Sequence, residues 1–416
     1  MKKAIVFAGG GSKGAYQIGV WKALNELGEH FDIATGTSIG AINAGFYVQH
    51  DFDAAYEMWT TLTPDEVMAN GLNLEKSFGA MFAQRGNIRS FFKEYVNNKG
   101  ADVSPLHDCI KKYYDPAAVA ASDIDFAIMT AELTSVTPPA VTPVTVTKEE
   151  ILGCGEDGWK WIAASAAAWP VFPVMQINGK NYVDGGYYDN IPVAAALRLG
   201  AERVLTVCLK PDAVNCAYEG HPWIDCIRPS KDLGTFLNFE RSVLDRSIDL
   251  GYCDTMKHFG RYYGKNFTLI PGSGADLDAL AKKFINVLTA DEAAFLSREK
   301  YHFQMGSRDP GCVPLLAGAS FEGRTDEKSL FAAALEKLLS MLGFDENTAI
   351  SVPAVLTALT RSLCAGNVPQ DFSGENALEN MRAYIISEYD ERRADIRAAE
   401  NDYCVLAACA LAKTLM

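Results

Sequence analysis

The sequence predicts an α/β fold with a mostly parallel central sheet and covering helices. Two observations in the first fifty residues carry this prediction. The apolar stretches 4–8 and 31–35 each precede a glycine-rich turn, and each turn precedes a segment with helical spacing of apolar residues. Successive strand–turn–helix units give parallel strands that are covered by helices. The 416 residues, 49% of them hydrophobic, suffice for a large α/β domain with an extension.

The remaining elements follow in order along the chain. The first helix is predicted from Ala15 to Leu27, where Gly28 ends the pattern, and the second begins at Ala41 after a turn over Gly36–Gly40. Residues 51–120 are predicted as helices and loops, in which 68–86 is either a cover or a packed connection. Further strands are predicted at 126–133, 140–147, 181–186 and 203–209. Pro143 favours a sheet edge for 140–147, because proline lacks the donor that a central strand needs.

The chain is predicted to divide near the sequence "GSGAD" at 272–276. Before this point strands alternate with helices, and after it the patterns are helical throughout. We therefore expect a catalytic α/β domain over 1–272 and a helical region of unknown role over 273–416. We expect that the second region governs substrate access or location and contributes no catalytic residue.

Composition excludes several classes of function. The formal net charge is -14, and no run of Lys or Arg is longer than a pair, so nucleic acid is not an expected partner. Ten cysteines without a C-x-x-C pair and six histidines without metal-ligand spacing predict no metal site and a reduced, cytoplasmic protein. The most apolar windows, 161–175 and 404–412, are too short to span a bilayer.

The glycine loop Gly9–Gly14, in "FAGGGSKGAYQIGV", has three interpretations. The spacing Gly9, Gly11, Gly14 matches a dinucleotide fingerprint, but the acidic residue that the fingerprint requires after the next strand is missing. A P-loop needs a lysine after its last glycine, whereas Lys13 precedes Gly14. The third interpretation is a set of unobstructed backbone N–H donors that stabilise a transient oxyanion.

The third interpretation is favoured by the neighbouring sequence "GTSIG", in which Gly36 and Gly40 flank Ser38. The pattern G-x-S-x-G at a strand-to-helix turn is typical of a nucleophile elbow. The glycines permit a sharp turn, and the helix N-terminus favours a developing negative charge. Ser38 is therefore the candidate nucleophile.

Asp184 is the candidate base. It ends an apolar strand segment and is followed by Gly185 and Gly186, which allow close approach to another loop. The alternative is an ordinary Asp-Gly turn. We expect catalysis to need none of the histidines, since no comparable setting surrounds His30, His50, His107, His221, His258 or His302.

The three motifs, in this order, resemble those of the patatin-like phospholipases. "GGGSKG" is similar to their glycine-rich oxyanion motif, "GTSIG" to their G-x-S-x-G and "DGG" to the motif that holds the aspartate of a Ser/Asp dyad. Further similarity lies in 103–115, 163–174 and 189–207, and the resemblance covers roughly residues 3–270. Lys13 stands where the family more often has arginine.

The resemblance implies Ser38 as nucleophile, Asp184 as general base and the backbone of Gly9, Gly10 and Gly11 as oxyanion hole. Lys13, Gly14, Gly36, Gly40, Gly185 and Gly186 would support these groups. It implies a lipid acyl hydrolase that cleaves carboxyl esters of glycerophospholipids or lysophospholipids without a cofactor or metal. The lipid substrate implies peripheral contact with membranes through apolar patches. An esterase, thioesterase, triacylglycerol lipase or non-catalytic lipid-binding protein remains the alternative, and the oligomeric state stays open.

Overall fold

The computed structural model describes residues 1–69, 101–136, 138–211, 220–272, 277–298, 312–341, 349–357, 410, 411 and 414. The predicted loop 68–86 therefore lies outside the described residues from 70 onward. Contacts divide the chain into two compact units, Met1–Thr255 and Met256–Met416. Each unit is described by itself.

The first unit contains an eight-stranded sheet of mixed direction, which confirms the predicted α/β class. Neighbouring strands follow the order β5-β6-β3-β2-β1-β7-β8, and β4 pairs with β3. The pairs β1–β2, β1–β7, β2–β3 and β7–β8 are parallel, whereas β3–β4, β3–β6 and β5–β6 are antiparallel. The strands are β1 (Lys3–Phe7), β2 (Ile33–Thr37), β3 (Asp125–Val136), β4 (Pro139–Thr147), β5 (Met175–Ile177), β6 (Lys180–Asp184), β7 (Arg203–Val207) and β8 (Ile224–Ile227).

Strand β1 lies inside the sheet, as its apolar sequence requires. Its backbone pairs with β2 on one side and β7 on the other, and Ala4 to Phe7 are fully buried. A strand that is covered on both faces reads as a continuous apolar run rather than as an alternating one. Ala4 and Val6 form a core cluster with residues of α11, so the opposite residues Ile5 and Phe7 face the other layer.

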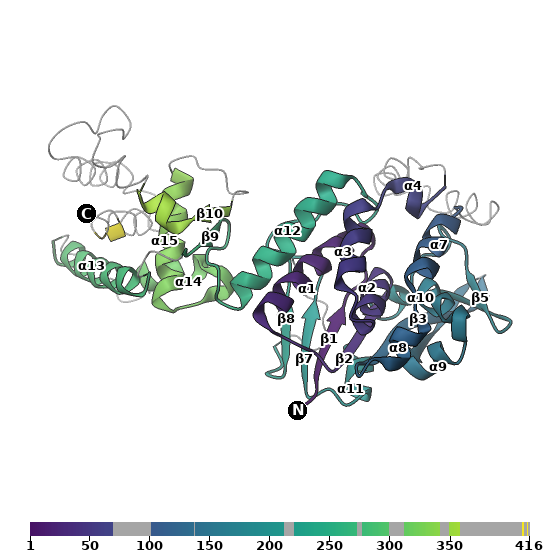
Figure 1. The fold of residues 1–416 in the computed structure, drawn as a ribbon. Coiled ribbons are helices and arrows are strands. Elements are labelled where there is room, and N and C mark those ends of the chain that lie inside the picture. Colours follow the sequence, from purple (N-terminus) through teal and green to yellow (C-terminus); the bar gives the residue numbers. More distant parts are fainter. Residues whose placement is uncertain are drawn as a thin grey trace. The chain divides into compact units, whose positions relative to one another are not determined.

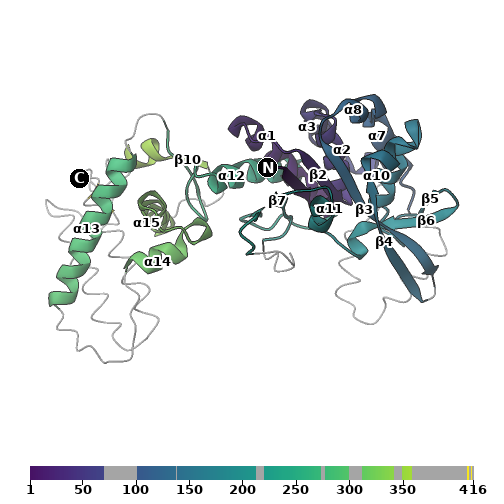
Figure 2. The ribbon, with the colours of Figure 1, turned by 90° about the horizontal axis from the view of Figure 1, so that it is seen from below.

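Helices cover both faces of this sheet. Figures 1 and 2 show α1, α2 and α3 on one side of the sheet and the short α11 on the other. The helices are α1 (Ala15–Leu27), α2 (Ile39–Val48), α3 (Phe52–Thr61), α4 (Pro64–Val67), α7 (Ser104–Tyr113), α8 (Pro116–Ala121), α9 (Lys148–Leu152), α10 (Trp159–Ser165), α11 (Val193–Arg198) and α12 (Arg241–His258), with 3₁₀ turns η1 (Gly11–Gly14), η2 (Gly155–Gly158) and η3 (Gly185–Tyr187). None of the helices among the described residues has both the length and the apolar character that a membrane span requires.

The second unit has its own hydrophobic core. Phe267, Phe284, Phe331 and Leu335 are almost completely buried within it. Its elements are β9 (Thr268–Ile270), α13 (Leu277–Arg298), α14 (Cys312–Ala319), η4 (Phe321–Gly323), α15 (Glu327–Met341) and β10 (Ala349–Ser351).

The boundary between the two units lies between Thr255 and Met256, earlier in the sequence than the boundary predicted at "GSGAD". Residues 256–272 belong to the second unit because Phe267 and Leu269 lie in its core and β9 pairs with β10. This pairing joins segments that are far apart in the sequence, so local patterns do not show it. The predicted division into a catalytic domain over 1–272 and a helical region of unknown role over 273–416 stays a prediction.

Candidate active site

Ser38 is the single residue between strand β2 and helix α2. Strand β2 continues through Thr37 and α2 begins at Ile39, so the turn predicted over Gly36–Gly40 consists of Ser38 itself, and the helix does not wait until Ala41. Ser38 has φ 57° and ψ -126°, a conformation that non-glycine residues rarely adopt. Such a residue costs on the order of 1–3 kcal/mol and is found mostly at functional sites. The backbone thus holds the Ser38 side chain away from both elements.

Gly36 and Gly40 make this sharp turn possible. A Cβ atom on Gly36 would lie 2.1 Å from the carbonyl oxygen of Gly40, and one on Gly40 would lie 2.2 Å from the carbonyl oxygen of Phe7. Both distances are far below van der Waals contact, and the obstructing atoms belong to the backbone. Residues with side chains at these positions would force β1, β2 and α2 apart.

The register of β3 explains why Ser38 and Asp184 meet. Strand β2 ends with Thr37 opposite Met129, and β6, which runs in the opposite direction, ends with Asp184 opposite Thr130. The two strands therefore approach end to end along the same side of β3. The residues that leave these two strand ends must lie next to each other.

The side chains of Ser38 and Asp184 are directly hydrogen-bonded. The Ser38 hydroxyl donates to Oδ2 of Asp184 at 2.6 Å, and Oδ1 accepts from the N–H of Gly186 at 2.7 Å. Asp184 is only 8% exposed. Burial raises the pKa of this carboxyl from 3.8 to about 6, although the hydrogen bonds from Ser38 and Gly186 oppose the rise. At neutral pH the group is an ionised carboxylate that is a stronger base than an exposed aspartate.

The two glycines after Asp184 have different roles. A Cβ atom on Gly185 would lie 2.2 Å from the carbonyl oxygen of Met129, so Gly185 permits the close approach of β6 to β3. Gly186 supplies the N–H that orients the carboxylate. The sequence-based interpretation of "DGG" as a close backbone approach agrees with this geometry.

Ser165, at the end of α10, was not predicted. Its hydroxyl donates to the carbonyl oxygen of Met129 at 2.6 Å and accepts from the N–H of Ser38 at 2.9 Å. The side chain is fully buried. It therefore ties the backbone of the elbow to β3. A single serine in an alanine-rich segment gives no local signal of this contact.

The glycine loop runs beside Ser38, but its three N–H groups differ. The N–H of Gly9 donates to the carbonyl oxygen of Asn190 at 3.1 Å, and the Asn190 side chain donates to the carbonyl oxygen of Gly9 at 3.0 Å. Within the described part of the chain, the N–H groups of Gly10 and Gly11 donate no hydrogen bond. The motifs of the sequence predict that all three glycines form the oxyanion hole. Because the N–H of Gly9 is bonded to Asn190, the N–H groups of Gly10 and Gly11 are the candidate donors.

Gly11 and Gly14 give the loop its shape. Gly11 has φ 60°, and a Cβ atom there would lie 2.0 Å from the carbonyl oxygen of Phe236. That same oxygen accepts from the N–H of Ser12 at 2.8 Å. A Cβ atom on Gly14 would lie 2.5 Å from the Ile39 side chain. The loop is thus packed against the 235–236 segment on one side and α2 on the other.

Lys13 points into the same cavity as Ser38. Its Nζ lies 4.0 Å from the exposed carboxylate of Asp232, and its side chain is only 15% exposed. Burial lowers the pKa of Lys13, Asp232 raises it and nearby Lys210 lowers it further. Lys13 therefore brings a partly buried positive charge to the wall of the cavity.

The cavity has a volume of about 940 Å³, and mostly apolar side chains line it. Ser38 and Asp184 lie in its wall together with Gly9, Gly10 and Gly11. The apolar lining includes Ile42, Met58, Leu62, Leu106, Ile110, Trp169, Phe172, Leu209, Leu237 and Phe239. The volume is within the upper range for sites that bind small organic molecules, and the Ser38 hydroxyl and the Asp184 carboxylate are among its few polar groups.

Histidines of the first unit lie elsewhere. His30, His50, His107 and His221 do not line this cavity, and His302 is outside the described residues. Over the described ranges, no three His, Cys, Asp or Glu side chains are placed to hold a metal ion. The polar groups next to Ser38 are instead the carboxylate of Asp184 and backbone N–H donors.

The fold and the site define an α/β protein with a serine on a strained strand-to-helix elbow, a hydrogen-bonded carboxylate and a glycine loop beside them. Residues 5–197 match the family model of the patatin-like phospholipases. The family that the motifs predicted therefore matches slightly less than half of the chain.

Curated relatives match about half of the chain. Lysophospholipase NTE1 of Mycosarcoma maydis is 27% identical over 207 residues, which cover 50% of this chain and 10% of the relative. Lysophospholipase NTE1 of Saccharomyces cerevisiae is 24% identical over 220 residues, covering 49% of this chain and 10% of the relative. The chain thus spans about a tenth of the length of these relatives. Among solved structures, VipD from Legionella pneumophila has a TM-score of 0.38 and 12% identity, with 100% of this chain and 90% of that chain covered.

Proposed function

We propose that the first unit is a lipid acyl hydrolase that cleaves carboxyl esters of glycerophospholipids or lysophospholipids through Ser38 and Asp184. The observation that carries this proposal is the 2.6 Å hydrogen bond between a strained serine and a buried carboxylate in the wall of a large apolar cavity. The family and the names of the curated relatives support a lipid ester as substrate.

The reaction begins with proton transfer from Ser38. Asp184 Oδ2 takes the hydroxyl proton while Oγ attacks the ester carbonyl carbon, and the C=O electron pair moves onto oxygen. The tetrahedral intermediate collapses when the C–O bond to the alcohol breaks, and protonated Asp184 returns the proton to that oxygen. An acyl group then remains on Ser38. Water then gives a proton to Asp184 and attacks the acyl carbon. The bond from this carbon to Ser38 Oγ breaks, Asp184 returns the proton to Oγ, and the fatty acid is released.

The glycine loop stabilises the intermediate. The N–H groups of Gly10 and Gly11 are the donors that we assign to the oxyanion, while Gly9 is held by Asn190. Backbone donors that are fixed in advance cost little reorganisation when the charge develops. The fixed contact between Ser12 and Phe236 supports this assignment because it restrains the loop.

Exposed aromatic side chains support contact with a lipid surface. Tyr187, Tyr188 and Phe236 are 52%, 64% and 40% exposed, and all three line the cavity. Amphipathic tyrosines are favoured at the interface between water and hydrocarbon. An acidic chain gains no general attraction to anionic lipids, so we propose that these side chains mediate peripheral contact.

The test compares the purified protein with Ser38→Ala in mixed membrane lipids, with released fatty acids measured by mass spectrometry. Ser104→Ala is a matched control, because Ser104 also donates to a carboxylate, Asp102, at 2.7 Å but at an exposed position. We expect fatty acids from the wild type and the control only, and fluorophosphonate labelling of Ser38 alone. Release that persists in Ser38→Ala would refute the proposal.

The alternatives have distinct outcomes in this experiment. A soluble-ester esterase, a thioesterase or a triacylglycerol lipase would release no fatty acid from phospholipids but would hydrolyse its own class of substrate through Ser38. A non-catalytic lipid-binding protein would release nothing from any ester. For residues 273–416 we propose a role in substrate access or location, and the separate core of the second unit supports a module of its own.

A further inference from the structure

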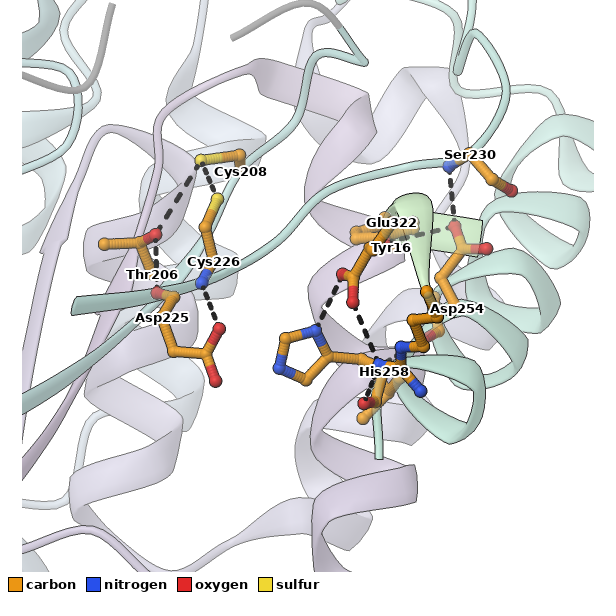
Figure 3. Close-up of polar contacts among 12 residues, drawn as sticks. Tyr16, Thr206, Cys208, Asp225, Cys226, Ser230, Asp254, His258 and Glu322 are labelled. Carbon is orange, nitrogen blue, oxygen red and sulfur yellow. Dashed lines mark hydrogen bonds and ion pairs between the residues drawn. The ribbon is translucent and has the colours of Figure 1, made fainter. Parts of the chain in front are cut away.

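Two cysteines lie close together at the edge of the sheet next to the glycine loop. Cys208 follows β7 and Cys226 lies in β8, and their Sγ atoms are 3.3 Å apart (Figure 3). The parallel ladder pairs Thr206 with Cys226, and the N–H of Cys208 donates to the carbonyl oxygen of Ile227. Because Cys208 is two residues beyond Thr206, its side chain is on the same face of the sheet as that of Cys226. The register itself brings the thiols together.

The two thiols differ in exposure and acidity. Cys208 is 1% exposed, whereas Cys226 is partly exposed. The pKa of the Cys226 thiol is lowered from 9.0 to about 6, chiefly by the hydrogen bond with Cys208 and further by Thr206 and the positive charge of Arg228, against the effect of burial. A thiolate is the nucleophile in thiol–disulfide exchange. Cys226 is therefore the thiol that reacts first.

The pair is joined to the candidate oxyanion loop. Cys208 lines the same cavity as Ser38, and the next residue, Leu209, packs against Gly10, where an added Cβ atom would lie 2.8 Å from Leu209 Cδ1. Val207, which precedes Cys208, is also held next to the glycine loop, since its carbonyl oxygen accepts from the N–H of Ala8 at 3.1 Å. A shift of the backbone at 208 would therefore reach Gly10 through Leu209.

We propose that Cys208 and Cys226 form a site of reversible oxidation, at which a low-molecular-weight disulfide such as oxidised glutathione converts the two thiols into a protein disulfide that slows hydrolysis. The effect on hydrolysis rests on the proposed function, whereas the formation of the disulfide does not.

The chemistry balances in two exchange steps. The Cys226 thiolate attacks one sulfur of oxidised glutathione, forms a mixed disulfide and expels a glutathione thiolate. The Cys208 thiol then loses its proton and attacks Sγ of Cys226, which expels the second glutathione thiolate. The two protons from the cysteines end on the two glutathione thiols. The protein pair loses two electrons, and glutathione disulfide gains them.

Bond formation requires movement near the catalytic loop. A disulfide has an S–S distance of about 2.05 Å, so the sulfur atoms must approach by about 1.2 Å from their present 3.3 Å. Among the described strands, β8 is at the edge of the sheet. Leu209, which follows two residues after the end of β7, packs against Gly10. Displacements of about 1 Å at a catalytic centre cost up to about a hundredfold in rate. We expect oxidation to reduce turnover by about tenfold.

The test treats the full chain with oxidised glutathione, blocks remaining thiols and maps peptides without reduction. We expect a Cys208–Cys226 peptide with the mass of both partners less two hydrogens. Hydrolysis of a short soluble ester by the same sample should fall about tenfold and recover with dithiothreitol. Cys226→Ser should stay active after the treatment. Cys109→Ser, which changes another cavity-lining cysteine, should respond as the wild type does.

Three results would overturn the proposal: a stable glutathione adduct without the internal bond, a disulfide to any other cysteine, or a Cys208–Cys226 bond with unchanged turnover. Peptide mapping of the wild type needs no variant, so it decides the first two even if Cys226→Ser fails to fold. Hydrolysis that survives Ser38→Ala would refute the proposed function instead, while the mapping would still decide whether the disulfide forms.

Discussion

The raised pKa of Asp184 predicts how the reaction depends on pH. Only the ionised carboxylate can accept the proton of Ser38, and burial raises the pKa of this group from 3.8 to about 6. The ionised fraction of a group with that pKa is about 90% at pH 7 and about 10% at pH 5. We therefore expect kcat/KM to fall about tenfold between pH 7 and pH 5, with the midpoint near pH 6.

The assay measures kcat/KM for a short soluble ester from pH 4.5 to 8 at constant ionic strength, with the rate of Ser38→Ala subtracted at each pH. A soluble ester avoids changes in lipid packing, and kcat/KM reports the pKa of the free enzyme. An exposed aspartate would stay about 90% ionised at pH 5 and give an almost flat profile. A midpoint below pH 5 would therefore refute the argument that burial sets the basicity of Asp184.

Three further predictions concern single residues of the site. First, Asp184→Asn should abolish turnover and raise the free energy of unfolding at pH 8 by up to about 3 kcal/mol. The reason is that the raised folded-state pKa of Asp184 gives a contribution to stability that is complete below about pH 4 and lost above about pH 6. Urea midpoints of both proteins that differ equally at pH 8 and pH 4 would contradict this. Second, Gly10→Val should lower kcat on the order of a hundredfold with near-native stability, since Gly10 has an extended φ of 166° and an added Cβ atom meets only the flexible side chain of Leu209. Gly11→Val, at φ 60° and against the backbone of Phe236, should instead destabilise the fold in thermal unfolding. A Gly11→Val protein that is inactive but as stable as the wild type would show that backbone crowding at Gly11 does not limit stability. Third, Ser165→Ala should lower the free energy of unfolding in urea by about 1–3 kcal/mol and reduce kcat, because the N–H of Ser38 and the carbonyl oxygen of Met129 lose their hydrogen bonds to Ser165. Unchanged stability would rule out the positioning role of Ser165.

The sequence predicted those parts of the fold that are encoded locally. Apolar runs and glycine stops predicted β1, α1 and β7 to within one or two residues, and the order of motifs predicted the family. The approach of Ser38 to Asp184 was expected only from their motifs. Its physical cause, the end-to-end meeting of β2 and β6 along β3, depends on strand register, which no local pattern contains.

The unpredicted contacts at the site join segments that are separated in the sequence. Ser165 reaches Ser38 across 127 positions, and Asn190 reaches Gly9 across 181 positions. The Cys208–Cys226 pair depends on the register of β7 and β8. Each of these residues is an ordinary serine, asparagine or cysteine in its own segment. Their roles follow from the partner, and the partner is known only when the topology is known.

The central place of β1 has a consequence for synthesis on the ribosome. Lys3 pairs with Arg203 in β7, and the loop after β1 is completed when Ser12 meets Phe236. Translation at about 5–20 residues per second delays these contacts by about 10–50 s after β1 emerges. During this interval an apolar strand has no permanent neighbour on its β7 side, so chaperones that bind extended hydrophobic segments have a window in which to act. The glycine loop after β1, although encoded first, is among the last parts of the first unit to reach its final form.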